Sequence, residues 1–106
     1  MELNSGQVDA LVDSGFKLWE RPPKRRLYID ANALGLECFR YDSGNISVAT
    51  MRGKKISNNR ARELDSAKTY IDIATGKVIS TDRELKKLAA ELMNEVLFPY
   101  MEELEE

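Results

Sequence analysis

Hydrophobic and polar residues follow two periods along this chain, and these periods predict where helices and strands lie. Helical spacing, with apolar residues three or four positions apart, occurs over residues 4–14, 57–66 and 81–97. Shorter runs rich in β-branched and aromatic residues are typical of strands. These runs predict strands over residues 16–19, 26–29, 36–41, 46–51, 55–56, 69–73 and 78–79.

Turn residues divide the predicted strands. Clusters of Gly, Asn, Asp, Ser, Thr and Lys predict three tight turns with hairpins around them, at residues 42–45, 52–54 and 74–77. Pro22 and Pro23 cannot donate backbone hydrogen bonds, so we expect a stiff turn there that forbids regular strand pairing. Asp30 is expected to cap a single helical turn that follows it.

The first two helices carry capping residues at their starts. Asn4, with Gln7 three residues later, is a capping pair, and Gly15 is expected to end the first helix. Ser57 or Asn58 can cap the second helix.

The C-terminal helix has the most regular pattern. Thr81 and Glu84 are spaced as a capping box, and Pro99 is expected to break or kink the helix because it has no N–H to donate. A narrow apolar stripe for packing follows the cap: Leu85, Leu88, Ala89, Leu92 and Val96.

Hairpins followed by a long helix predict an α+β fold. We expect an antiparallel β-hairpin sheet packed by the long C-terminal helix, with short N-terminal and central helices. The length of 106 residues suits one domain, over residues 1–98, followed by an acidic tail over 99–106 that is prone to fray.

Composition narrows the chemistry. Hydrophobic residues make up 42% and charged residues 32%, which is typical of a soluble globular domain. The sequence has no His and a single cysteine, Cys38, so His-based triads and four-ligand zinc sites are excluded. No glycine-rich phosphate-binding motif occurs. We therefore expect no catalytic residues, no cofactor and no metal: a protein that is not an enzyme.

The same sequence shows no apolar run of membrane-spanning length and no secretion signal. A cytoplasmic protein without membrane contact is the expectation.

Charge is distributed unevenly along the chain despite a net charge of −2. Residues 1–16 carry three acids and no base, residues 17–62 carry eleven bases and four acids, and residues 63–106 carry five bases and eleven acids. Basic side chains that share one surface would bind nucleic acid through its phosphates. The candidates are Lys24, Arg25, Arg26, Arg52, Lys54, Lys55, Arg60 and Arg62. Tyr28, Phe39 and Tyr41 are nearby aromatics that could stack on bases.

Three alternatives to nucleic-acid binding stay open. In one, the carboxylates of residues 82–106 mimic nucleic acid and bind a basic protein surface. The basic and acidic halves can fold against each other, so that their charges interleave inside one molecule. The chain can also be a protein-interaction module or inhibitor of a host or phage protein. Its candidate contacts are Trp19 and the apolar residues of the acidic C-terminal segment, Phe98, Tyr100, Met101 and Leu104.

Five short strings occur along residues 19–80: RLYID at 26–30, LGLE at 34–37, SGNIS at 43–47, KISN at 55–58 and KTYIDI at 68–73. Together they resemble small, mostly uncharacterised proteins of phage or mobile-element type from Gram-positive or gut bacteria. The resemblance implies no known activity or site residue. It favours an accessory protein that binds a partner over a metabolic enzyme.

Overall fold

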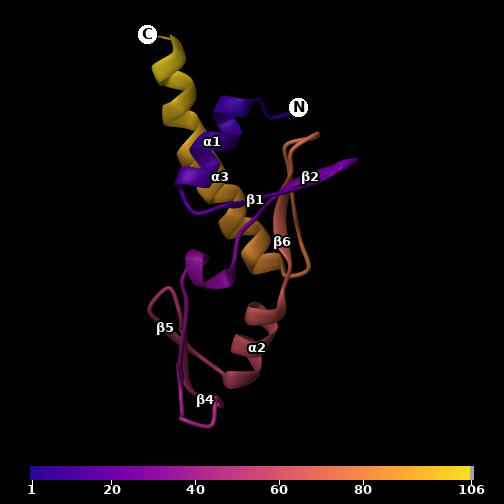
Figure 1. The fold of residues 1–106 in the computed structure, drawn as a ribbon. Helices are drawn as coiled ribbons and strands as arrows, with labels where there is room; N and C mark the ends of the chain where they lie inside the picture. Colours follow the sequence, from indigo (N-terminus) through magenta and orange to yellow (C-terminus); the bar gives the residue numbers. More distant parts are fainter. Residues whose placement is uncertain (106) are drawn as a thin grey trace.

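The computed structural model describes residues 1–105, which form three α-helices, one 3-10 helix and seven strands (Figure 1). The helices are α1 (Ser5–Asp13), η1 (Ala31–Leu34), α2 (Asn58–Ser66) and α3 (Arg83–Glu105). All strand pairs are antiparallel, and the strands form two sheets. The predicted α+β class with a long C-terminal helix is confirmed, but the strands form two sheets where one was expected.

Sheet A has four strands in the order β1-β2-β6-β7. Their bounds are β1 (Lys17–Arg21), β2 (Lys24–Tyr28), β6 (Thr69–Asp72) and β7 (Lys77–Ser80). The pairing of β2 with β6 joins segments that are distant in sequence, and it sets Tyr28 directly opposite Tyr70.

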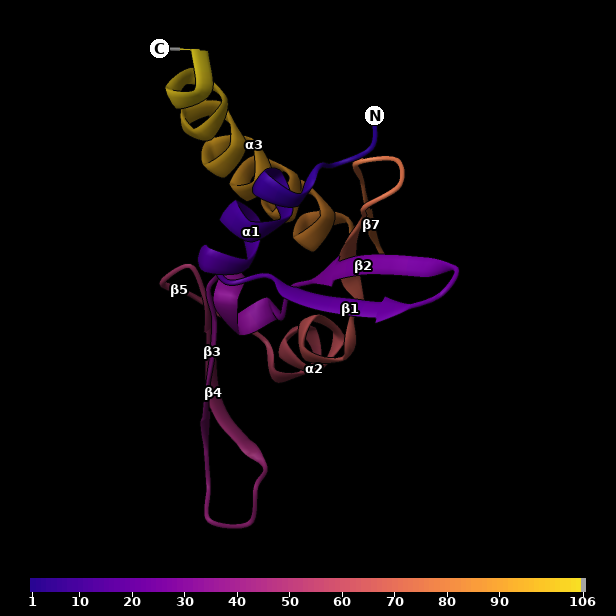
Figure 2. The ribbon, with the colours of Figure 1, turned by 45° about the horizontal axis from the view of Figure 1, so that its top comes forward.

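The β1–β2 hairpin corrects the expectation for the proline pair. Pro22 and Pro23, joined by a cis peptide bond, form the two-residue turn itself, and the flanking strands pair in full from Lys17 to Arg21 (Figure 2). The expected stiff turn is present, and only the expected loss of regular pairing was wrong, because a proline disrupts pairing within a strand and these two lie between strands.

Sheet B has three strands in the order β3-β4-β5. Their bounds are β3 (Leu36–Arg40), β4 (Ile46–Met51) and β5 (Lys54–Ile56). The turns predicted at 42–45 and 52–54 connect them. The strand register shifts between Phe39 and Arg40.

The helices cover one face of each sheet. α1 packs on β1 and β2, α3 packs on β6 and β7, and α2 packs on β3 and β4. Fully buried side chains from both sheets belong to one continuous apolar core, including Leu27 and Ile71 of sheet A and Ala49 of sheet B. The core joins the sheets into a molecule measuring 49 × 32 × 23 Å.

Helix capping follows the sequence at two of the four predicted sites, and Asp30 makes no capping hydrogen bond to η1. Asn4 and Gln7 form the predicted capping box, and Ser57 rather than Asn58 caps α2 by accepting from the Arg60 N–H. At α3, however, Asp82 accepts the Leu85 N–H at 3.1 Å, replacing the predicted role of Thr81. Thr81 instead accepts the N–H of Lys68, at the entry to β6.

The predicted break at Pro99 does not occur. α3 continues through Pro99 to Glu105. Residues beyond the proline are held by α1: Gln7 donates to Met101 Sδ at 3.4 Å, and the Tyr100 ring lies against Gly6. Residues 99–105 of the expected tail are therefore helical, and Glu106 lies outside the described residues.

Candidate nucleic-acid interface

One face of sheet A lies opposite the packed helices, and we name it the outer face. Its side chains follow from the strand register, because alternate residues of a strand point to opposite sides. The buried residues Leu27, Thr69 and Ile71 point toward the helices. The outer face consists of Lys17, Trp19, Arg21, Lys24, Arg26, Tyr28, Tyr70, Asp72, Lys77 and Ile79.

Three aromatic rings form a row across three strands of this face. Trp19 and Tyr28 meet edge to face, with ring centroids 6.2 Å apart and planes at 82°. Tyr28 and Tyr70 follow at 5.2 Å with planes at 41°. These geometries stabilise the row, because edge-to-face and tilted rings bring the positive edge of one ring to the negative face of the next. Trp19, on the edge strand β1, is the most exposed of the three.

Arginine side chains lie among these rings. The Arg26 guanidinium is 4.3 Å from the centroid of Tyr70 and 6.0 Å from that of Trp19, and Arg21 is 5.9 Å from Trp19. Arg26 Nη1 also donates to the Tyr28 hydroxyl at 3.1 Å, and this hydrogen bond raises the pKa of Arg26. The cation is therefore fixed over the rings and stays charged at all physiological pH values.

The outer face carries excess positive charge. Five of its residues are basic, whereas Asp72 is its one acid. Lys17 pairs with Asp30 at 2.8 Å, so this cation of the face is already neutralised. Among residues 1–104, no carboxylate lies within 4.0 Å of the side-chain nitrogens of Arg21, Lys24, Arg26 or Lys77. These four cations therefore have no acidic partner there, although Arg26 is held by Tyr28 and Tyr70.

The residues at the end of the β1–β2 hairpin border a cavity of about 300 Å³. Lys24, Arg25 and Arg26 line it together with Asp72 and the β6–β7 turn. Of the first predicted basic group, Lys24 and Arg26 belong to the outer face, whereas Arg25 points to the opposite side of β2. Arg25 is partly neutralised there, because its guanidinium pairs with Glu20 at 2.9 Å on the other side of the hairpin.

The second predicted basic group lies elsewhere. Arg52, Lys54 and Lys55 belong to the β4–β5 turn and to β5 of sheet B. Figures 1 and 2 both place this turn on the far side of the molecule from the tip of the β1–β2 hairpin. Phe39, an exposed ring on β3, and Tyr41, which follows it, are also outside sheet A. The predicted basic groups therefore do not form one surface.

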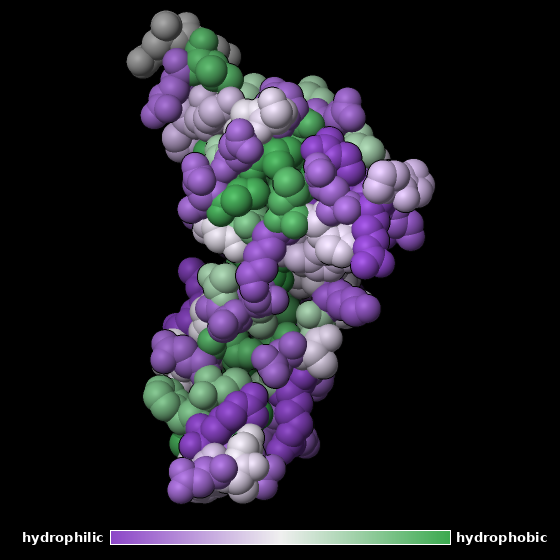
Figure 3. All heavy atoms as spheres, in the orientation of Figure 1, coloured by the Kyte–Doolittle hydropathy of each residue, from purple (hydrophilic) through white to green (hydrophobic). Residues whose placement is uncertain are grey.

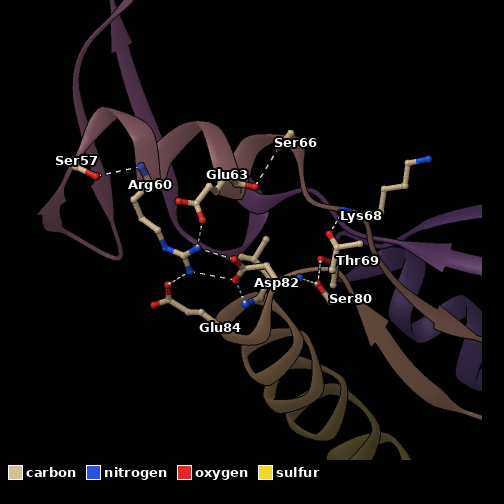
Figure 4. A network of polar contacts seen from close by, with 11 residues as sticks. Ser57, Arg60, Glu63, Ser66, Lys68, Thr69, Ser80, Asp82 and Glu84 are labelled. Atoms are coloured by element: carbon tan, nitrogen blue, oxygen red, sulfur yellow. Dashed lines mark hydrogen bonds and ion pairs between the residues drawn. The ribbon is translucent and has the colours of Figure 1, made fainter.

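The third basic group is largely engaged inside the protein. Arg60 contacts Asp82 through two hydrogen bonds of 2.6 and 3.1 Å, and it also pairs with Glu84 and Glu63 (Figure 4). Arg60 lowers the pKa of Asp82, and the Asp82 and Glu84 carboxylates raise the pKa of Arg60. Arg62 is exposed and donates to Asn59. The charges of the two halves of the chain thus interleave at this point.

The residues predicted to bind a protein are also separated. Trp19 belongs to the outer face of sheet A. Tyr100 is half-buried against α1, whereas Phe98, Met101 and Leu104 are exposed near the end of α3. Figure 3 shows apolar atoms there among polar ones.

Sequence reasoning missed the contributions of Tyr70, Arg21, Lys17 and Lys77 to the outer face. The available signal was strand alternation, which sets Arg21 on the same side as Trp19. Tyr70 could be placed only with the β2–β6 register, which local sequence does not contain.

Within the described part of the chain, no group of three or more acidic or cysteine residues is arranged to hold a metal ion. Over residues 1–105, none of the helices combines the length and the apolar character that a bilayer crossing requires. Comparisons with protein-family models, with curated proteins and with solved structures give no match.

Proposed function

We propose that this chain is a non-enzymatic accessory protein that binds nucleic acid through the outer face of sheet A. The observation that carries the proposal is the row of Trp19, Tyr28 and Tyr70 with four unpaired cations around it. The phage or mobile-element type implied by the resemblance fits such a role and stays a prediction.

The combination of aromatic rings and cations supports nucleic-acid binding because it can contact both the phosphates and the bases. Lys and Arg side chains neutralise phosphates, while aromatic and guanidinium planes stack on bases. The overall pI of about 5.3 is acidic, but the acidic residues of α3 lie on the opposite side of sheet A. A ligand at the outer face would therefore contact the local positive charge of that face and not the acidic residues of α3.

Paired charge reversals test the proposal. Lys24→Glu with Lys77→Glu should weaken binding to labelled nucleic acid and flatten the plot of log affinity against log salt. The magnitude of that slope falls by about 0.7 to 0.9 for each phosphate that the protein no longer neutralises. Lys54→Glu with Lys55→Glu on sheet B is the matched control, since it makes the same charge change on exposed residues. Equal effects of the two pairs would refute the assignment to sheet A.

A second candidate is protein binding through the end of α3. Phe98 and Leu104 are 67% and 63% exposed, more than other large apolar side chains of the described residues except Met1. If this segment docks a second copy, sedimentation should show a dimer that Phe98→Ser with Leu104→Ser abolishes. A monomer at all concentrations would exclude self-association through α3.

A further inference from the structure

We propose that the nucleic acid bound by the outer face is single-stranded, and that one of its bases stacks on the indole of Trp19. This inference rests on the proposed function and specifies its ligand. It follows from which ring faces are free, which are already occupied, and where the free cations lie around them.

Exposed aromatic rings of a protein can stack only on a ligand whose own ring faces are accessible. In a duplex the bases stack on each other, so a protein meets their edges and the phosphates. Bases of a single strand can be splayed out and stacked on aromatic side chains. Aromatic rings on an open sheet face therefore favour a single strand.

Trp19 is the ring best placed to receive a base. Tyr70 already has the Arg26 guanidinium 4.3 Å from its centroid, so its face is occupied. Tyr28 is half-buried between the other two rings. Arg21 and Arg26 also lie over the Trp19 ring, but at 5.9 and 6.0 Å from its centroid they are farther away than Arg26 is from Tyr70. Trp19 is 36% exposed and stands on β1, the edge strand of sheet A.

The cations surround this position. Arg21 lies on the same strand two residues away, and Arg26 lies opposite Trp19 on β2. Lys24 is opposite Arg21 at the hairpin end, beside the cavity of about 300 Å³. A base on Trp19 would thus bring the phosphates on either side of it within reach of three side chains.

The β1–β2 hairpin also suggests a competing mode. A two-stranded ribbon can enter the major groove of a duplex, and this hairpin extends beyond β6 with Arg21 and Lys24 at its end. In that mode the cations would contact phosphates and base edges, and the Trp19 ring would not receive a base. The two modes therefore differ in whether a base stacks on the Trp19 indole.

Trp19 is the one tryptophan in the sequence, so the indole fluorescence of the protein reports on this position alone. The experiment titrates the full chain with a single-stranded oligonucleotide of about 12 nucleotides, a length within the usual single-strand site sizes. Parallel titrations use the same sequence as a duplex, and heparin, an anionic polymer without bases. Fluorescence anisotropy of labelled ligands gives the affinities.

We expect the single strand to bind most tightly and to quench the indole, whereas heparin binds without comparable quenching. Trp19→Ala should weaken single-strand binding by about fivefold or more, and Trp19→Phe, which keeps a ring, should weaken it less. Phe39→Ala, which removes an exposed ring from sheet B, is the matched control and should change nothing.

The outcomes separate this inference from the proposed function. Binding that prefers the duplex, or single-strand binding that leaves the indole unquenched and survives Trp19→Ala, would overturn the stacking inference and keep the nucleic-acid proposal. No binding to either nucleic acid at low salt would overturn both.

Discussion

Asp82 performs two tasks with one carboxylate. The carboxylate accepts the Leu85 N–H at the start of α3, and it also forms a bidentate ion pair with Arg60 of α2. Its side chain is only 11% exposed, so both interactions are shielded from water. The residue therefore couples the capping of one helix to the position of another (Figure 4).

Two substitutions of Asp82 should separate these tasks. Asp82→Asn keeps a capping oxygen and loses the charge, so we expect a loss of about 1 kcal/mol in the free energy of unfolding. Asp82→Ala loses both and should cost about 2–3 kcal/mol. Urea denaturation measures both. Asp65→Asn, which removes an exposed 3.7 Å pair with Arg40, is the control and should stay within about 0.5 kcal/mol. Equal losses for the two Asp82 variants would show that the capping oxygen adds nothing beyond the charge.

The Asp82–Arg60 pair also predicts a pH dependence. Arg60 holds the pKa of Asp82 below its ordinary value of 3.8, so the folded state binds a proton less readily than the unfolded state. The resulting stability is complete above the unfolded pKa and is lost as pH falls toward the folded pKa. The stability gap between wild type and Asp82→Asn should therefore narrow below about pH 4. A gap that stays constant down to about pH 3 would contradict the assignment.

At the scale of elements, α3 shows how tertiary contacts override a local rule. Pro99 cannot donate a hydrogen bond to the preceding turn, which should destabilise the helix. Yet the residues after it contact α1, where Gly6 leaves room for Tyr100 and Gln7 reaches Met101. Packing on α1 offsets the missing hydrogen bond.

Replacing this proline should therefore stabilise the protein. Pro99→Ala restores a backbone donor inside α3 without touching the residues that pack on α1. We expect the free energy of unfolding to rise by about 1–3 kcal/mol and the helical circular dichroism signal to be retained. Urea denaturation compares the variant with wild type. A lower stability would mean that the restriction Pro99 imposes on the unfolded chain outweighs the missing bond.

The same elements show what sequence could and could not predict. Periodicity located the helices, the strands and three hairpins, because these depend on residues close together in the chain. It could not predict the pairing of β2 with β6, because that pairing is decided by burial of Leu27 and Ile71 under the helices. The row of rings depends on that pairing, so Trp19 and Tyr28 were noticed separately and Tyr70 was missed.

Across the whole molecule, the uneven charge of the sequence has two outcomes. Part of it is internal, since Arg60 from the basic segment meets Asp82 and Glu84 from the acidic one. A second part is exposed, with unpaired cations on the outer face of sheet A, the acidic α3 behind that sheet, and Lys54 and Lys55 on sheet B. A net charge of −2 therefore conceals a basic surface.

The two sheets share one core, and this predicts that they unfold together. Leu36 and Met51 of sheet B belong to the same buried cluster as Leu27 and Ile71 of sheet A, and the Arg60 contacts add a second connection. A small domain with a continuous core unfolds in one cooperative transition. The sequence supplies a probe for each sheet: Trp19, the one tryptophan, on sheet A, and Cys38, the one cysteine, on sheet B.

Urea unfolding followed by Trp19 fluorescence and by pulsed thiol labelling of Cys38 should give the same midpoint and the same slope. Asp82→Ala should shift both curves by the same amount, because the interactions it removes stabilise one cooperative unit. Cys38 is half-buried in the native protein, so the native labelling rate serves as the baseline. If Cys38 reacts fully at urea concentrations where Trp19 is still native, the sheets are separate folding units.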